Sequence, residues 1–201
     1  MMNGSWRLPR VRLLRFIMGG KKTSRRSWNR NLRENLTFLR SQKQSKSSFP
    51  GSTQVLRIAW VGVGSELNGD DAAGLYAIRG LAPILMDEPH FLCLESGVNP
   101  ENALGPLRKF HPDLVVMVDA ADFGEPAGNI RFIKNAEVGG ISFSTHSLPM
   151  NLISEYLGRE LDCPVWLLGI QPASLEFAAP LTIKVRRAVD SLVLEISRII
   201  Q

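Results

Sequence analysis

Cysteine is scarce in this 201-residue chain, and long apolar runs are missing. The two cysteines, Cys93 and Cys163, lie far apart and form no C-x-x-C pair, so the chain lacks the disulfide framework of a small secreted domain. Each falls in or beside an expected strand, and we expect two buried free thiols in a reducing compartment. No apolar run reaches the roughly 18 residues that a membrane-spanning helix needs. The sequence therefore predicts a cytoplasmic protein with no membrane partner.

Acidic residues are almost absent from the first quarter of the chain. Residues 1–54 contain 13 of the 24 lysines and arginines but only one acid, Glu34, which leaves 11 basic and 18 acidic side chains for the remainder. The net charge of +5 therefore comes from this segment. It gives no reason to expect that the body of the protein binds nucleic acid.

Residues 1–52 are rich in Arg, Lys, Ser and Asn and show no sustained helical or strand period. Such a composition is typical of chains that bury too little apolar surface to fold. A transit peptide, a disordered arm for nucleic acid or membrane, and a non-native segment translated from too far upstream remain open. We expect a basic disordered or non-native segment over 1–52, followed by a single α/β domain over 53–201.

Strand-like and helix-like segments alternate from Val55 onward. Short apolar runs predict strands at 55–64, 90–97, 112–121 and 164–170, and an alternating segment predicts an edge or antiparallel strand at 128–134. Helical spacing of apolar residues predicts helices over 70–85, 99–110, 147–161 and 179–200. This pattern favours a three-layer α/β fold, in which a twisted, mostly parallel sheet has helices on both faces and one antiparallel edge strand. Functional sites of such folds collect at the carboxyl ends of the strands.

Ionisable residues stand at those strand ends. Asp70 and Asp71 follow the first strand, Asp119 ends the apolar run "LVVMVD", and His146 precedes an expected helix. Two carboxylates and an imidazole could bind a divalent metal ion and leave positions open for a substrate. Helix capping by Asp70 or Asp71, a turn cap by Asp119 and a core hydrogen bond of His146 are the structural alternatives.

A nucleotide-binding loop is a second interpretation of the same stretch. Gly62 and Gly64 fit the first two glycine positions of G-x-G-x-x-G, but Leu67 stands at the third, and Glu95 could bind a ribose. Acidic residues around the loop would repel a pyrophosphate. The pattern therefore disfavours a nucleotide cofactor.

Four stretches, in order, resemble the nickel–iron hydrogenase maturation endopeptidases, and are most similar to the branch that processes hydrogenase 3 of formate hydrogenlyase. They are "GVGSELNGDDAAG", "VVMVDAADFGEPAGNIRFI", "STHSLPMNLISEYL" and "WLLGIQPASLEFAAPLT". The resemblance covers nearly all of the chain from Val55 onward, and the first 50 residues have no counterpart in it. It implies an α/β enzyme that removes a C-terminal peptide from the hydrogenase large-subunit precursor after nickel insertion.

The resemblance also implies which residues act. Metal-binding and catalytic positions of the family fall on Asp71, Asp119 and His146, and the nickel is expected to arrive with the substrate. We expect a monomer whose partner is the large-subunit precursor, with no nucleic-acid partner. A non-proteolytic nickel-sensing chaperone of the same fold is the alternative, with a nucleotide-binding domain less favoured. Gln171 and Glu176 could line a peptide groove or belong to a structural loop.

Overall fold

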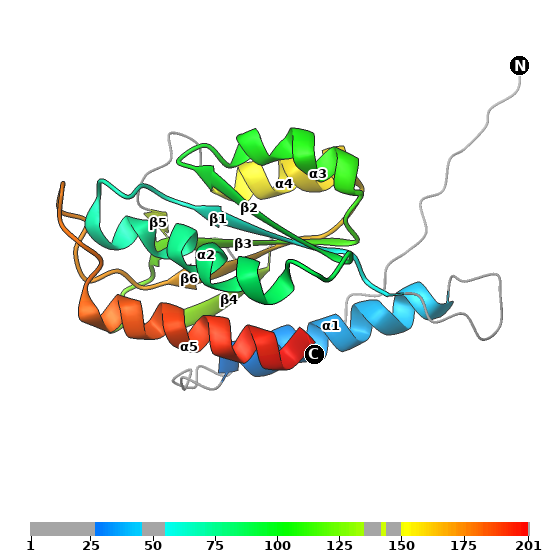
Figure 1. Cartoon of the computed structure of the whole chain (residues 1–201), viewed down its shortest axis with the longest axis horizontal. Coiled ribbons are helices and arrows are strands. Elements are labelled where there is room, and N and C mark those ends of the chain that lie inside the picture. The colour runs from blue at the N-terminus through cyan, green and yellow to red at the C-terminus, as the bar shows by residue number, and fades with distance from the viewer. Residues whose placement is uncertain (1–26, 46–54, 135–141, 144–149, 201) are drawn as a thin grey trace, which may run out of the picture.

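The computed structural model describes residues 27–45, 55–134, 142–143 and 150–200 (Figure 1). The strands are β1 (Ile58–Val63), β2 (Phe91–Gly97), β3 (Leu114–Asp122), β4 (Ile130–Lys134), β5 (Ser142–Phe143) and β6 (Val165–Ile170). The α-helices are α1 (Ser27–Ser45), α2 (Ala73–Leu85), α3 (Leu104–Phe110), α4 (Met150–Leu161) and α5 (Ile183–Ile200). Two short 3₁₀ helices, η1 (Gly69–Ala72) and η2 (Pro100–Ala103), precede α2 and α3.

The strands form one mostly parallel sheet in the order β2-β1-β3-β6-β4. β1 pairs with β2 and β3 in parallel, and β3 pairs with β6 in parallel. β4 is antiparallel to β6 at the edge, and the short β5 is antiparallel to the end of β3. The predicted α/β fold with an antiparallel edge strand is confirmed.

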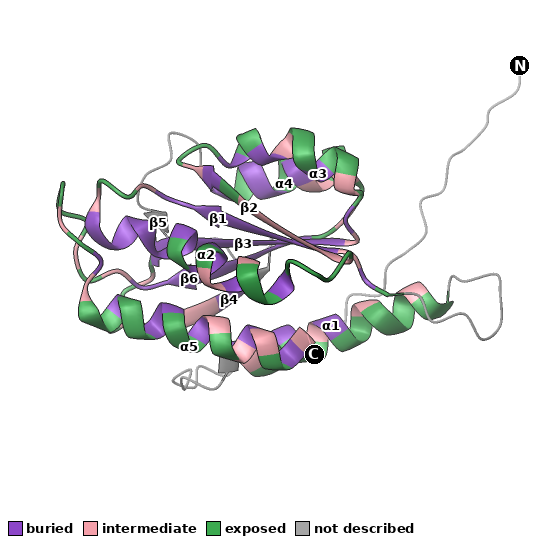
Figure 2. Ribbon diagram, viewed as in Figure 1, coloured by how far each residue is buried: buried purple, intermediate pink, exposed green. Residues whose placement is uncertain are grey.

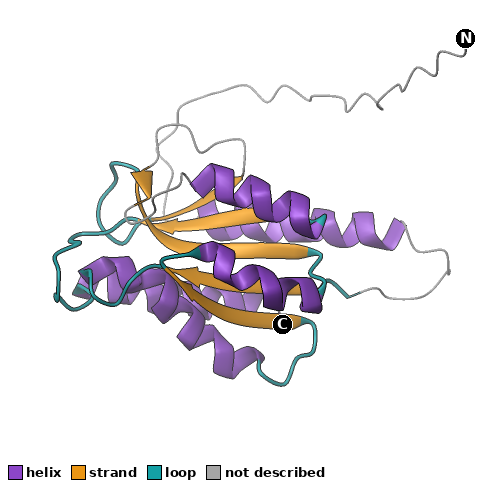
Figure 3. Cartoon of the chain, turned by 90° about the horizontal axis from the view of Figure 1, so that it is seen from above, coloured by secondary structure: helices purple, strands orange, loops and turns teal. Residues whose placement is uncertain are grey.

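Helices cover both faces of this sheet (Figures 1 and 3). Ile58 and Trp60 of β1 point into a core shared with α1, α2 and α5, whereas Ala59 and Val61 point into a core shared with α3 and α4. Every residue of β1 and β6 is buried, because side chains on both faces of these central strands are covered. The continuous apolar runs of the sequence therefore follow from the three layers.

Helix α1 contradicts the expected disorder for part of the N-terminal segment. Trp28, Leu32 and Leu36 recur every fourth residue, so they form one stripe along the helix, and all three are buried in the core. α1 contacts β4 and α5 through this stripe and exposes its other side to solvent (Figure 2). The prediction of a disordered segment is wrong for residues 27–45, because the apolar stripe of this helix is buried in the core. The rest of 1–52 lies outside the described residues, and the division at residue 52 stays a prediction.

None of the helices in the described ranges combines the length and the apolar character required to cross a membrane.

Candidate functional site

Asp71 lies in η1, directly after the turn that ends β1. Its side chain is fully buried, and its Oδ2 accepts a hydrogen bond of 2.6 Å from the backbone N–H of Ser65. Gly64 has a φ of +130°, and a Cβ at this position would lie 1.9 Å from the carbonyl oxygen of Asp71. Only glycine fits this turn, and the turn fixes the orientation of the Asp71 carboxylate.

Asp119 lies within β3, directly after the last residue of β3 that pairs with β1. The pairing of β3 with β1 stops at Val118, but its pairing with β6 continues through Asp119 and Ala120. β3 continues to Asp122, one residue beyond the predicted strand at 112–121, so Asp119 ends the apolar run but lies inside the strand. The side chain is only 1% exposed. Burial of a carboxylate at this position, just past the β1–β3 pairing, costs free energy unless polar partners or a cation offset the loss of water.

The start of α2 brings these two carboxylates to the same edge of the sheet. A Cβ on Gly74 would lie 2.1 Å from the carbonyl oxygen of Val118 and 2.3 Å from that of Val63. The helix therefore packs directly on the backbones of β1 and β3, and η1 also contacts β3. Asp71 is three residues before Gly74, and Asp119 directly follows Val118.

His146, the third predicted ligand, lies outside the described residues. Within the described ranges, no three histidine, cysteine, aspartate or glutamate side chains are grouped in a way that could bind a metal ion. The set of Asp71, Asp119 and His146 as metal-binding and catalytic residues thus stays a prediction.

Asp70 has a different role from the helix cap that the sequence suggested. The N-cap residues of η1 and α2 are Asn68 and Ala72, not Asp70. Its Oδ1 accepts from the N–H of Thr182 at 2.7 Å, and its Oδ2 accepts from Ala173 N–H at 2.8 Å, Ser174 N–H at 3.1 Å and the Thr182 hydroxyl at 2.9 Å. Asp70 is fully buried. It therefore attaches η1 to the loop between β6 and α5, an interaction that local sequence patterns could not reveal.

Gln171 supports the loop that follows β3. Its Oε1 accepts hydrogen bonds from the N–H groups of Phe123 and Glu125, and its Nε2 donates to Asp122 at 3.0 Å. The hydrogen bond from Gln171, with one from the N–H of Gly124, holds the pKa of Asp122 below its ordinary value. Gln171 is thus a structural residue, as one of the two interpretations expected, and Glu176 is exposed on the neighbouring loop.

The residues named in the nucleotide interpretation have other roles in the structure. Glu95 forms an ion pair with Arg79 of α2 at 2.7 Å, and Glu66 pairs with the same guanidinium. These two carboxylates raise the pKa of Arg79. Leu67, at the position of the third glycine, is 60% exposed. The carboxylate expected to bind a ribose therefore already has a cationic partner.

Both cysteines are free thiols and partly buried. Burial raises the pKa of Cys93 to about 11 and, with the nearby carboxylate of Asp113, raises that of Cys163 to about 12. Both thiols are protonated at neutral pH, which makes them poor nucleophiles.

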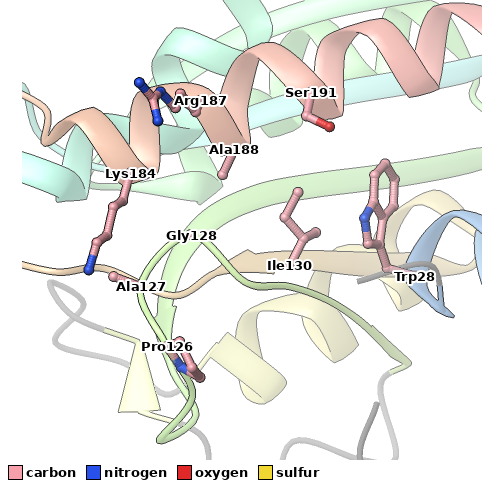
Figure 4. A pocket seen from close by; sticks show the side chains of 9 residues that line it. All are labelled: Trp28, Pro126, Ala127, Gly128, Ile130, Lys184, Arg187, Ala188 and Ser191. Atoms are coloured by element: carbon pink, nitrogen blue, oxygen red, sulfur yellow. The ribbon is translucent and has the colours of Figure 1, made fainter. Parts of the chain in front are cut away.

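A cavity of about 460 Å³ lies between α5, the turn before β4 and α1 (Figure 4). Trp28 and Ile130 line it on one side, and Lys184, Arg187 and Ala188 of α5 line it on the other. It is lined by none of the residues predicted for the site.

Comparison with known proteins points to one family. The sequence model described as hydrogenase maturation protease matches residues 76–199, a range that includes Asp119 and His146 and begins after Asp71. The chain is 30% identical over 131 residues to the hydrogenase 3 maturation protease of Escherichia coli K12, covering 65% of this chain and 82% of that protein.

Solved structures agree with this match. The crystal structure of the NiFe hydrogenase maturation protease HycI from Thermococcus kodakarensis is 30% identical, with a TM-score of 0.66 over 72% of this chain and 92% of that one. The solution structure of the endopeptidase HycI from Escherichia coli is 29% identical, with a TM-score of 0.59 over 69% of this chain and 88% of that one.

Proposed function

Because the chain belongs to the hydrogenase maturation protease family and is a peptidase, we propose that it removes a C-terminal peptide from a nickel-loaded hydrogenase large-subunit precursor. The observation that carries the proposal is the burial of Asp71 and Asp119 at one edge of the sheet. Burying two carboxylates in an apolar interior costs free energy, but it suits an enzyme that must bind a cation.

Asp71, Asp119 and His146 are the proposed ligands for the nickel ion that the precursor carries. Carboxylate and imidazole groups suit a borderline divalent ion of this kind. An empty precursor would lack this attraction, so the enzyme would discriminate against it. The ion would also polarise the scissile carbonyl or activate a water molecule, and either would assist hydrolysis.

Covalent catalysis by cysteine does not fit the chain. The raised pKa of Cys93 and that of Cys163 leave little thiolate at neutral pH. Cys163 also precedes β6, at the end of the strand opposite to the carboxyl edge. We therefore propose a water molecule, not a thiol, as the nucleophile. The two free thiols agree with a reaction in the cytoplasm.

The test is cleavage of a purified, nickel-loaded precursor of the cognate hydrogenase, followed by intact mass spectrometry. Wild-type protein should release a C-terminal peptide, and Asp119→Asn and His146→Ala should lower the rate at least about 100-fold, because both would remove a ligand from the site. Asp190→Asn, an exposed carboxylate on α5, is the matched control and should cleave like wild type.

Nickel-free precursor should stay intact with every variant. A wild-type protein that leaves the loaded precursor uncut would contradict the proposal, and nickel-dependent binding without cleavage would indicate a chaperone instead. Equal cleavage of loaded and empty precursor would rule out nickel recognition.

A further inference from the structure

Two loops beside the predicted catalytic residues expose large apolar side chains. Leu67, in the loop between β1 and η1, is 60% exposed, and Phe177, in the loop between β6 and α5, is 73% exposed. Leu175 of the second loop is 39% exposed. Both loops lie at the carboxyl ends of the parallel strands, at the left of Figure 1. Apolar surface of this kind next to a polar site is typical of a binding surface.

Backbone hydrogen bonds join the two loops. The N–H of Ala178 donates to the carbonyl oxygen of Leu67 at 2.7 Å, and the N–H of Asp70 donates to that of Ser174 at 2.9 Å. Gly69 has a φ of +55°, and a Cβ on it would lie 2.8 Å from the carbonyl oxygen of Ser174. The backbones of the two loops, which carry the exposed side chains, are therefore fixed relative to each other.

The Asp70 carboxylate fixes this arrangement relative to Asp71. It accepts three backbone N–H groups and one hydroxyl from residues 173–182, and its neighbour in the chain is Asp71. Hydrogen bonds to a charged acceptor are stronger than those between neutral groups, and their directions are more restricted. A shift of the loop would break several of them at once.

We propose that Leu67, Leu175 and Phe177 bind an apolar segment of the hydrogenase precursor, and that Asp70 is a positioning residue that holds this surface in register with Asp71. The inference rests on the proposed function. The precursor is the occupant because the loop of Leu67 leads directly into η1, which carries Asp71, and Asp70 binds the second loop to the same η1. A chain bound there reaches the site, whereas a second copy of this protein would obstruct it.

The test measures kcat and KM for cleavage of loaded precursor by Phe177→Ala and Leu67→Ala. Removing an exposed side chain that becomes buried on binding should raise KM roughly tenfold for each variant and leave kcat unchanged. Tm should stay within about 1 °C of wild type, because exposed side chains contribute little to folding. Phe38→Ala is the matched control, since Phe38 is 59% exposed on α1, and it should change neither KM nor Tm.

The positioning role of Asp70 is tested by a double-mutant cycle. Thr182→Val removes one hydrogen bond to Asp70 and keeps the side-chain shape, and Asp70→Asn changes the acceptor itself. If Asp70 positions the surface, each should raise KM at least about threefold, and Phe177→Ala should add less on top of either variant than it does alone. A lowered Tm with wild-type KM, or additive effects on KM, would show that Asp70 is only structural.

Failure of this inference is distinguishable from failure of the proposed function. If wild type cleaves the precursor but Phe177→Ala and Leu67→Ala keep the wild-type KM, the surface does not bind substrate and only this inference is overturned. If wild type sediments as a dimer and Phe177→Ala as a monomer with wild-type KM, the surface binds a second copy and the inference is again overturned.

Discussion

At the carboxyl edge of the sheet the chain packs backbone against backbone, whereas α1 is held on β4 and α5 by apolar side chains. The edge needs glycine at 64 and 74, because the carbonyl oxygens of Asp71, Val118 and Val63 occupy the space of a side chain. The α1 layer needs only apolar volume at three positions, Trp28, Leu32 and Leu36. The first kind of contact specifies particular residues, and the second tolerates exchange among apolar ones.

The largest effect is expected for Gly74→Ala. Its Cβ would lie 2.1 Å from a backbone oxygen that cannot move without distorting β3, so the free energy of unfolding should fall by more than about 3 kcal/mol in urea titration. Gly105→Ala in α3 is the control, because a Cβ there meets nothing within 4 Å. It should change the free energy of unfolding by less than about 1 kcal/mol. Equal losses of the free energy of unfolding in the two variants would show that the close backbone contact of Gly74 does not require glycine.

Substitutions of Leu32 test whether the packing of α1 tolerates other apolar side chains. Leu32→Ala leaves a cavity and should lower the free energy of unfolding by about 2–3 kcal/mol, while Leu32→Met keeps the volume and should cost less than about 1.5 kcal/mol. The precursor should be cleaved at the wild-type rate by both variants at a temperature where they are folded. A loss in Leu32→Met as large as in Leu32→Ala would show that α1 requires a specific side chain.

A smaller effect is expected for the ion pair between Lys43, in the last turn of α1, and Asp113. Lys43 donates to the carboxylate of Asp113, and both side chains are partly exposed, at 24% and 29%. Lys43→Gln should therefore lower the free energy of unfolding by less than about 1 kcal/mol, and less still at high salt. Asp113→Asn should cost more, because Asp113 also accepts from the N–H of Arg57. Equal losses in the two variants would place the stability in the ion pair that both remove, and a larger loss in Lys43→Gln would place it in the hydrogen bond from Lys43 to the carbonyl oxygen of Val55.

The cysteines should give the free energy of unfolding no pH dependence near neutral pH. Their pKa values in the folded protein, about 11 for Cys93 and about 12 for Cys163, are raised above the unfolded value of about 8.5. The folded state therefore binds these protons more tightly, and this contribution is complete below about pH 8.5 and lost as pH rises toward 11 and 12. Iodoacetamide should label the folded protein slowly at pH 8 and about tenfold faster for each pH unit up to about 11. Labelling at pH 8 as fast as in urea would contradict this.

The sheet and its flanking helices could be predicted because burial on both faces leaves a continuous apolar run, as in β1 and β6. α1 could not, because its three core residues lie among polar and basic ones that suggest disorder when the opposing face is unknown. The positions of Asp71 and Asp119 at the carboxyl edge follow from the rule for parallel sheets. The role of Asp70 does not, since its donors are backbone groups of residues 173–182, more than 100 positions later.

That separation in sequence has a consequence for the newly made protein. Synthesis proceeds from the N-terminus, so η1 leaves the ribosome long before Thr182 exists. Until then the Asp70 carboxylate has none of its four native donors and stays hydrated rather than entering the interior. The contact between η1 and the loop that precedes α5 can therefore form only after the chain has been extended past Thr182.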